Sequence, residues 1–290
     1  MKKVLLVINR VPLQRQLIAR AGLLAGSLGG RLYVYHGVYD PVEEIDRYIG
    51  LDNFSEVRDA LLTERESLLR ETLGELCEPD SLRVEWCKRG SVAVREWAND
   101  IGADLVVTEL AEHRGFDGII HHADQWDLLR NISCPVFLVS ARSKPVDTVL
   151  AAVDSLDESE GHAQLTARLL DQARTMAKIF HSPLNVLSVI PASELRLAVE
   201  ARLSDAVNLS GLLEERCMDQ LQQTLDELGL AAEELQVLEG RPEKVIVEEA
   251  EKGGLLVMGR VANRDLVDKL LGGTSERVLH RATCDVLLVN

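Results

Sequence analysis

Short runs of apolar residues alternate along the chain with longer segments in which apolar residues recur every three or four positions. Residues 13–28 belong to the second kind, with Leu13, Leu17, Ala21 and Leu24 on one helical face. Runs of the first kind are VLLVI (4–8), RLYVYHGV (31–38), LRVEWCKRG (82–90), DLVVTE (104–109) and PVFLV (135–139). The short runs predict buried strands and the periodic segments predict amphipathic helices. Buried strands separated by helices indicate a parallel sheet that is covered on both faces.

The pattern occurs twice. The segment KRGSVAVREWANDIGADLVVTEL (88–110) aligns with LEGRPEKVIVEEAEKGGLLVMGR (238–260), and SCPVFLV (133–139) aligns with TCDVLLV (283–289). The first strands correspond as well, KKVLLVIN (2–9) with DTVLAAVD (147–154). We therefore predict an α/β protein of two tandem, doubly wound domains, residues 1–142 and 147–290, each with a five-stranded parallel sheet.

Charge and cysteine usage narrow the function classes. The 290 residues carry a formal net charge of −15, which argues against non-specific binding to nucleic acid or to an anionic membrane. The five cysteines are odd in number and none forms a CxxC pair, so we expect a reducing, cytoplasmic environment. The apolar run in MKKVLLVINR is too short for a signal peptide or a membrane span.

Candidate binding residues fall where the strands of the second half end. Asp154 follows the first strand and Gly259 ends the fourth, while Gly272, Gly273, Thr274 and Ser275 lead into the helix before the last strand. Glycines allow a backbone to approach a phosphate, and a helix start presents unpaired N–H groups. Ligands of such sheets bind beyond the carboxyl ends of the strands.

The spacing of these glycines resembles the G-x2-G-x9-G-[ST] signature with which the universal stress protein family binds ATP. This chain has Gly259, Ala262, Gly272 and Gly273 at the four positions. The resemblance extends over both halves, and ADQWDLLRNISCPVFLV (123–139) is similar to the first half of tandem members of the family. It implies a stress-response binding protein that forms a homodimer in the cytoplasm.

The resemblance also implies a ligand, ATP or AMP, in the second domain. Asp154 then stands beside the adenine, and Gly259, Gly272 and Gly273 surround the phosphates. The complete candidate set is Asp154, Val189, Gly259, Arg260, Ala262, Arg264, Gly272, Gly273, Thr274 and Ser275. Arg260 and Arg264 would offset phosphate charge.

Two departures from the signature weaken this expectation. Ala262 adds a Cβ atom at a glycine position, which costs about 1 kcal/mol if the backbone there needs a positive φ. Gly273 lacks the hydroxyl of the family's Ser or Thr, although Thr274 and Ser275 follow it. The alternative, that these glycines only form turns and pack closely, remains open.

The first half departs further. Glu109 stands where the second half has Gly259, and Asn9 replaces Asp154. An acidic side chain at a phosphate position repels the ligand, so we expect no nucleotide in this half.

Other candidate sites are weaker. His113, His121 and His122 lie near Asp117 and Asp124, but their spacing is poor for a metal site and we favour exposed histidines. We expect Trp97 and Trp126 to pack in the core.

Known enzyme motifs are missing, so we expect binding, with weak ATP hydrolysis at most. Two alternatives remain. One is a nucleotide-free dimerisation module that uses the last strands, 136–139 and 286–289. The other is a carrier of an apolar small molecule with a cavity in the first half.

Overall fold

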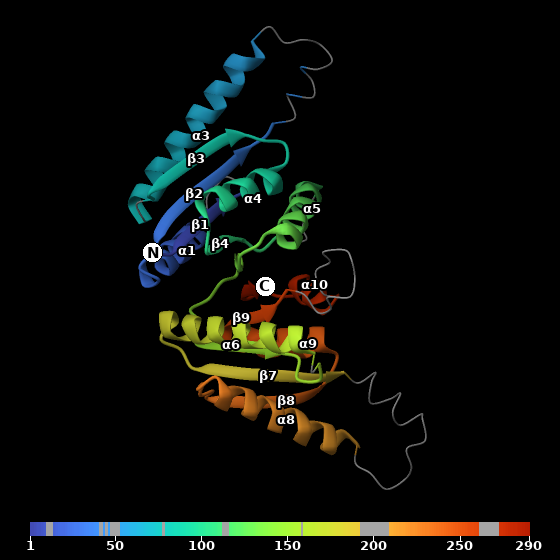
Figure 1. Cartoon of the computed structure of the whole chain (residues 1–290). Helices are drawn as coiled ribbons and strands as arrows, with labels where there is room; N and C mark the ends of the chain where they lie inside the picture. Colours follow the sequence, from blue (N-terminus) through green and yellow to red (C-terminus); the bar gives the residue numbers. More distant parts are fainter. Residues whose placement is uncertain are drawn as a thin grey trace. The chain divides into compact units, whose positions relative to one another are not determined.

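The chain forms two compact units, Met1–Ala141 and Arg142–Asn290, which are described separately (Figure 1). The structure is a computed structural model that describes residues 1–9, 14–40, 43, 46, 53–76, 79–111, 116–157, 159–191, 209–260 and 273–290. Among these residues, no helix combines the length and the apolar character needed to cross a membrane.

Unit 1 is a five-stranded parallel sheet with helices between its strands. The strands of this unit lie in the order β3-β2-β1-β4-β5, and neighbouring strands are parallel. In chain order the elements are β1 (Lys3–Ile8), α1 (Arg15–Ser27), β2 (Arg31–Val38), α3 (Phe54–Leu76), β3 (Ser81–Trp86), α4 (Gly90–Ile101), β4 (Leu105–Glu109), α5 (Phe116–Asn131) and β5 (Val136–Val139).

Unit 2 repeats this plan. Its strands follow the order β10-β9-β6-β7-β8 and are again parallel, so the predicted tandem α/β fold is confirmed. The elements are β6 (Thr148–Val153), α6 (Glu160–Phe180), β7 (Leu184–Pro191), α8 (Leu209–Glu227), β8 (Glu234–Gly240), α9 (Pro242–Gly253), β9 (Gly254–Gly259), α10 (Gly273–Leu279) and β10 (Asp285–Val289).

The central strand β6 sets where a ligand can enter unit 2. From β6 the chain moves outward through β7 to β8, then crosses back to β9 and β10 on the other side of β6. Right-handed crossovers place α6 and α8 on one face of the sheet and α9 and α10 on the other. The chain therefore leaves β6 and β9 in opposite directions, which opens a crevice at their carboxyl ends.

The residues of α6 explain why this helix lies against the sheet. Its apolar side chains recur at helical spacing and are buried: Leu165, Leu169, Leu170, Ala173 and Met176. Glu160 in the first turn and Lys178 in the last turn complement the helix dipole. The helix packs against β6 and β9, so its first turns border the crevice.

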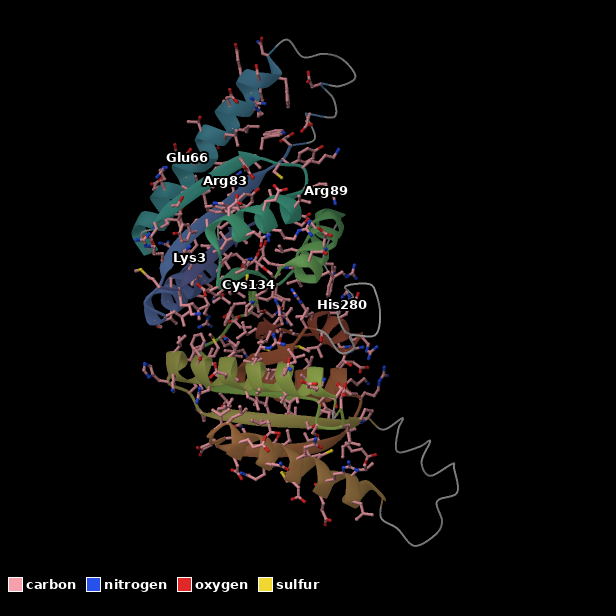
Figure 2. All side chains as sticks on the ribbon, in the orientation of Figure 1. Lys3, Glu66, Arg83, Arg89, Cys134 and His280 are labelled. Carbon is pink, nitrogen blue, oxygen red and sulfur yellow. The ribbon has the colours of Figure 1, made fainter. Side chains whose placement is uncertain are left out.

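Trp97 and Trp126 lie in the interior, as expected, and so do several cysteines. Cys134 and Cys284 are buried free thiols, and burial raises the pKa of Cys284 to about 12. Trp97 contacts the ring of Tyr35 at a centroid distance of 5.9 Å. The guanidinium of Arg83, which is labelled in Figure 2, lies 5.9 Å from the centroid of the Trp97 ring. Trp126 is 8% exposed.

Two glycines in unit 2 have a positive φ, but only one of them is closely surrounded by other atoms. Gly229 has a φ of 59° with open space around it, whereas Gly254 has a φ of 94° and a Cβ atom there would lie 2.8 Å from the carbonyl oxygen of Pro145. We expect Gly229→Ala to lower the free energy of unfolding by about 1 kcal/mol and Gly254→Ala by more than about 2 kcal/mol. Urea denaturation of both variants measures the difference. Equal losses would contradict the steric account.

Candidate functional site

A cavity of about 270 Å³ lies at the carboxyl ends of β6 and β9, where the crevice was expected. Five of the ten candidate residues line it: Asp154, Val189, Gly259, Thr274 and Ser275. Arg260 and Gly273 directly follow or precede lining residues along the chain. Ala262, Arg264 and Gly272 lie outside the described residues. The structure thus brings half of the candidate set around one space.

The walls of the cavity are largely apolar. Leu165 and Leu169 come from α6, Ile246 from α9 and Met258 from β9, while Val153 ends β6. Because α6 and α9 lie on opposite faces of the sheet, these side chains approach the space from two sides. Apolar walls with a few polar groups at one end are typical of sites for small organic molecules.

Asp154 supplies the acidic group at the end of β6. Its side chain is exposed, and one carboxylate oxygen accepts a hydrogen bond from the backbone N–H of Leu156 at 3.0 Å. This bond fixes the orientation of the carboxylate. A carboxylate has about four lone-pair sites, so Asp154 keeps acceptor capacity for a donor within the cavity.

Gly259 has a packing role, which is one of the two roles that the sequence left open. A Cβ atom at this position would lie 3.0 Å from Cδ2 of Leu165, and Ser275 donates its hydroxyl to the Gly259 carbonyl oxygen at 2.8 Å. The next N–H, that of Arg260, bonds to the carbonyl oxygen of Val289 at 2.8 Å. Close packing therefore explains Gly259 without a ligand, and the backbone N–H of Arg260 already has an acceptor.

Two cavity-lining polar residues were missed in the sequence. His162 and Thr166 come from the first turns of α6. Their spacing of four residues, at the start of the helix that follows Asp154, was the available signal. The Nδ1 atom of His162 lies 3.5 Å from Oδ2 of Asp157. Hydrogen bonds from the backbone and hydroxyl of Ser159 lower the pKa of Asp157.

A buried carboxylate with two arginines lies beside the cavity. Glu243, in the first turn of α9, is only 3% exposed. Its carboxylate lies 2.9 Å from a guanidinium nitrogen of Arg241 and 3.7 Å from Nε of Arg277. A hydrogen bond from its own backbone N–H is the main reason that the pKa of Glu243 is lowered; burial opposes this, and the two arginines add to it.

The corresponding groups of unit 1 bond to one another. Asn9 donates to the hydroxyl of Thr108 at 3.0 Å, and Gln14 donates to the carboxylate of Glu109 at 3.0 Å. Gln125 bonds to the carbonyl oxygen of Glu109 and accepts the N–H of Ala111 at 3.1 Å. Glu109 itself is 7% exposed. At the carboxyl ends of β1 and β4, these polar groups therefore form hydrogen bonds with other protein groups.

The described residues also bear on the candidate metal ligands. Asp124 accepts the N–H of Ser91 at 2.9 Å and thereby caps the first turn of α4. No group of three metal-ligating side chains occurs among the residues that the structure describes. His113 and the side chains of Asp117, His121 and His122 lie outside the described residues.

The lowered pKa of Glu243 implies that the free energy of unfolding depends on pH. Because its pKa in the folded state is below the ordinary 4.5, the ionised carboxylate adds stability above that value, and this contribution is lost as the pH falls through the folded-state pKa. We expect Glu243→Gln to be less stable than the wild type at pH 7, with the gap shrinking as the pH falls below the ordinary pKa of 4.5 and through the lower pKa of the folded state. Urea denaturation at several pH values measures the gap.

Glu248→Gln is the matched control, because Glu248 is an exposed residue of the same helix. We expect it to change the free energy of unfolding by less than about 0.5 kcal/mol at every pH. A gap between Glu243→Gln and the wild type that stays constant over the whole range would contradict the role given to the ionised carboxylate.

Comparison with known proteins identifies the fold family. The Universal stress protein family matches residues 1–140 and again residues 145–290. Universal stress protein E of Escherichia coli (strain K12) is 24% identical over 285 residues, which cover 94% of this chain and 88% of that protein. Universal stress protein A homolog 1 of Coxiella burnetii is 31% identical over 143 residues, 49% of this chain and 94% of that protein.

A solved structure has the same architecture. A putative universal stress protein from Pseudomonas aeruginosa UCBPP-PA14 superposes with a TM-score of 0.70 at 23% identity, covering 99% of this chain and 92% of that one. The chain therefore belongs to the universal stress protein family and is a tandem, Universal stress protein E-like member with two copies of the domain.

Proposed function

We propose that unit 2 binds an adenine nucleotide, ATP or AMP, in the cavity at the ends of β6 and β9. The observation that carries the proposal is the convergence of Asp154, Val189, Gly259, Thr274 and Ser275 on one space. Gly259 belongs to the family signature, and the five residues come from four separate places in the chain: 154, 189, 259 and 274–275. Inherited turn glycines alone do not require a cavity between them.

The dimensions and lining of the cavity support a base and a sugar. Its volume of about 270 Å³ is close to the lower end of small-molecule sites, which are roughly 300–1,000 Å³. The apolar walls from Leu165, Ile246 and Met258 suit a flat aromatic ring, and Asp154 accepts a hydrogen bond from the base or the ribose. In this placement the phosphates lie at the edge of the cavity, towards Gly273.

We propose that unit 1 binds no nucleotide, so that each chain has one site. Glu109 places a carboxylate at the end of β4, where unit 2 has Gly259. Gln14 and Gln125 hold this residue through hydrogen bonds, which a ligand would have to break. Repulsion of phosphate and the loss of these bonds both act against binding.

We propose that the protein acts in the stress response by binding a ligand and not by catalysis. The homodimer and the cytoplasmic location stay predictions from the family resemblance. The nucleotide-free interaction module is the competing proposal, and it differs in one measurable respect. A ligand that binds only the folded chain must raise the melting temperature, whereas an interaction module is unaffected by nucleotide.

Titration with ATP tests the proposed function. We expect isothermal titration calorimetry to give one ATP per chain, and we expect Asp154→Ala to weaken binding about tenfold through loss of one hydrogen bond to a charged group. Asp171→Ala is the control, since Asp171 is an exposed carboxylate on α6 that pairs with Arg174. Absence of binding heat together with an unchanged melting temperature in ATP would refute the proposal, and two equal sites would refute its assignment to unit 2.

A further inference from the structure

The position of Gly273 draws attention to a neighbouring arginine. In the family signature this position carries a Ser or Thr hydroxyl, which the chain lacks. A Cβ atom at Gly273 would lie 3.5 Å from Nη1 of Arg277. The guanidinium of Arg277 thus lies next to the space that the side chain of a Ser or Thr would enter. The missing hydroxyl and the nearby cation occur at one place.

Arg277 and Arg241 share one carboxylate. We call these two residues the arginine pair. Arg277 approaches Glu243 through Nε at 3.7 Å, and Arg241 approaches it at 2.9 Å. The Glu243 side chain is 4% exposed, whereas those of Arg241 and Arg277 are 66% and 55% exposed. The carboxylate is therefore inside and the two guanidinium groups face outward.

The charges of this group favour an anion. Two cations and one carboxylate leave one net positive charge, on a chain whose formal net charge is −15. A guanidinium offers five N–H donors, and the ion pair of Arg277 with Glu243 is made through Nε. Among the described residues Glu243 is the carboxylate that pairs with Arg277, so donor capacity on its Nη atoms remains for a ligand.

The two chain segments that contain Arg241 and Arg277 also contribute residues to the cavity wall. Pro242, between Arg241 and Glu243, lines the cavity, and so do Thr274 and Ser275, which follow Gly273. The first turn of α9 packs near α10, and Glu243 joins the two helices through Arg277. Neighbours of both arginines therefore line the cavity, and both guanidinium groups meet at Glu243 beside it.

We infer that the arginine pair holds the phosphate groups of the nucleotide in unit 2, with Glu243 as the residue that positions it. The inference rests on the proposed function and adds to it the chemical class that the site prefers, a nucleoside polyphosphate over an uncharged nucleoside. Arg277 takes over the role of the absent hydroxyl at Gly273, because a guanidinium brings a full positive charge and several N–H donors to a phosphate. Glu243 keeps the side chains ordered before the ligand arrives, which reduces the entropy lost on binding.

Calorimetric titration of the full chain with ATP, adenosine and tripolyphosphate tests the inference. We expect Arg277→Ala to weaken ATP binding about tenfold to a hundredfold and to leave the affinity for adenosine unchanged. Arg277→Lys keeps the positive charge but loses the planar guanidinium. We expect its ATP affinity to lie between those of the wild type and Arg277→Ala. Arg174→Ala is the matched control, because it removes an exposed arginine from α6 without touching the cavity.

Arg241→Ala provides a second variant in case Arg277→Ala does not fold, and the melting temperature without ligand reports folding. An equal affinity of wild type and folded arginine variants for ATP would overturn the role of the arginine pair and leave the proposed function standing. If the wild type binds neither ATP nor adenosine, the proposed function fails and tripolyphosphate decides the inference. Binding of tripolyphosphate that Arg277→Ala abolishes supports the arginine pair, whereas absent or unaltered binding overturns it.

Discussion

The reversal of strand order around β6 is the constraint on which the rest of unit 2 depends. Because β7 and β9 flank β6, the chain leaves the carboxyl ends of β6 and β9 towards opposite faces of the sheet. The two departing segments cannot cover the ends of these strands. Side chains of α6 and α9 then line the remaining space from both sides. The cavity is therefore a consequence of topology, and its chemistry is decided by the residues at the strand ends.

The two units show how side chains change a site that the fold conserves. In unit 2, Ser275 bonds to the carbonyl oxygen of Gly259; in unit 1, Gln125 bonds to the carbonyl oxygen of Glu109 at the corresponding place. The same carbonyl thus finds a partner in both copies. Unit 1 adds longer side chains at this place, since Gln14 and Gln125 both bond to Glu109.

Much of the fold and part of the site could be predicted from the sequence. Continuous apolar runs identify strands buried on both faces, and the repeat fixes their number in each half. Asp154 and Gly259 were found because they end such strands. His162 was missed, since its contact with the cavity depends on how α6 turns towards the sheet. The sequence left two roles open for Gly259, phosphate contact and close packing, because its approach to Leu165 involves residues distant in sequence.

Glu243 and Arg277 could not be paired from the sequence for the same reason, since 34 positions and a strand separate them. A buried carboxylate near a phosphate site is unfavourable when it acts alone, because like charges repel. It becomes favourable when the carboxylate pairs with two cations, so that the group as a whole is positive. Glu243 pairs in this way with Arg241 and Arg277. A flexible arginine loses rotamer entropy on binding a ligand, and an arginine already held by a fixed carboxylate has lost part of it on folding. In the proposed site the buried acid therefore contributes order, and the exposed guanidinium groups contribute the positive charge.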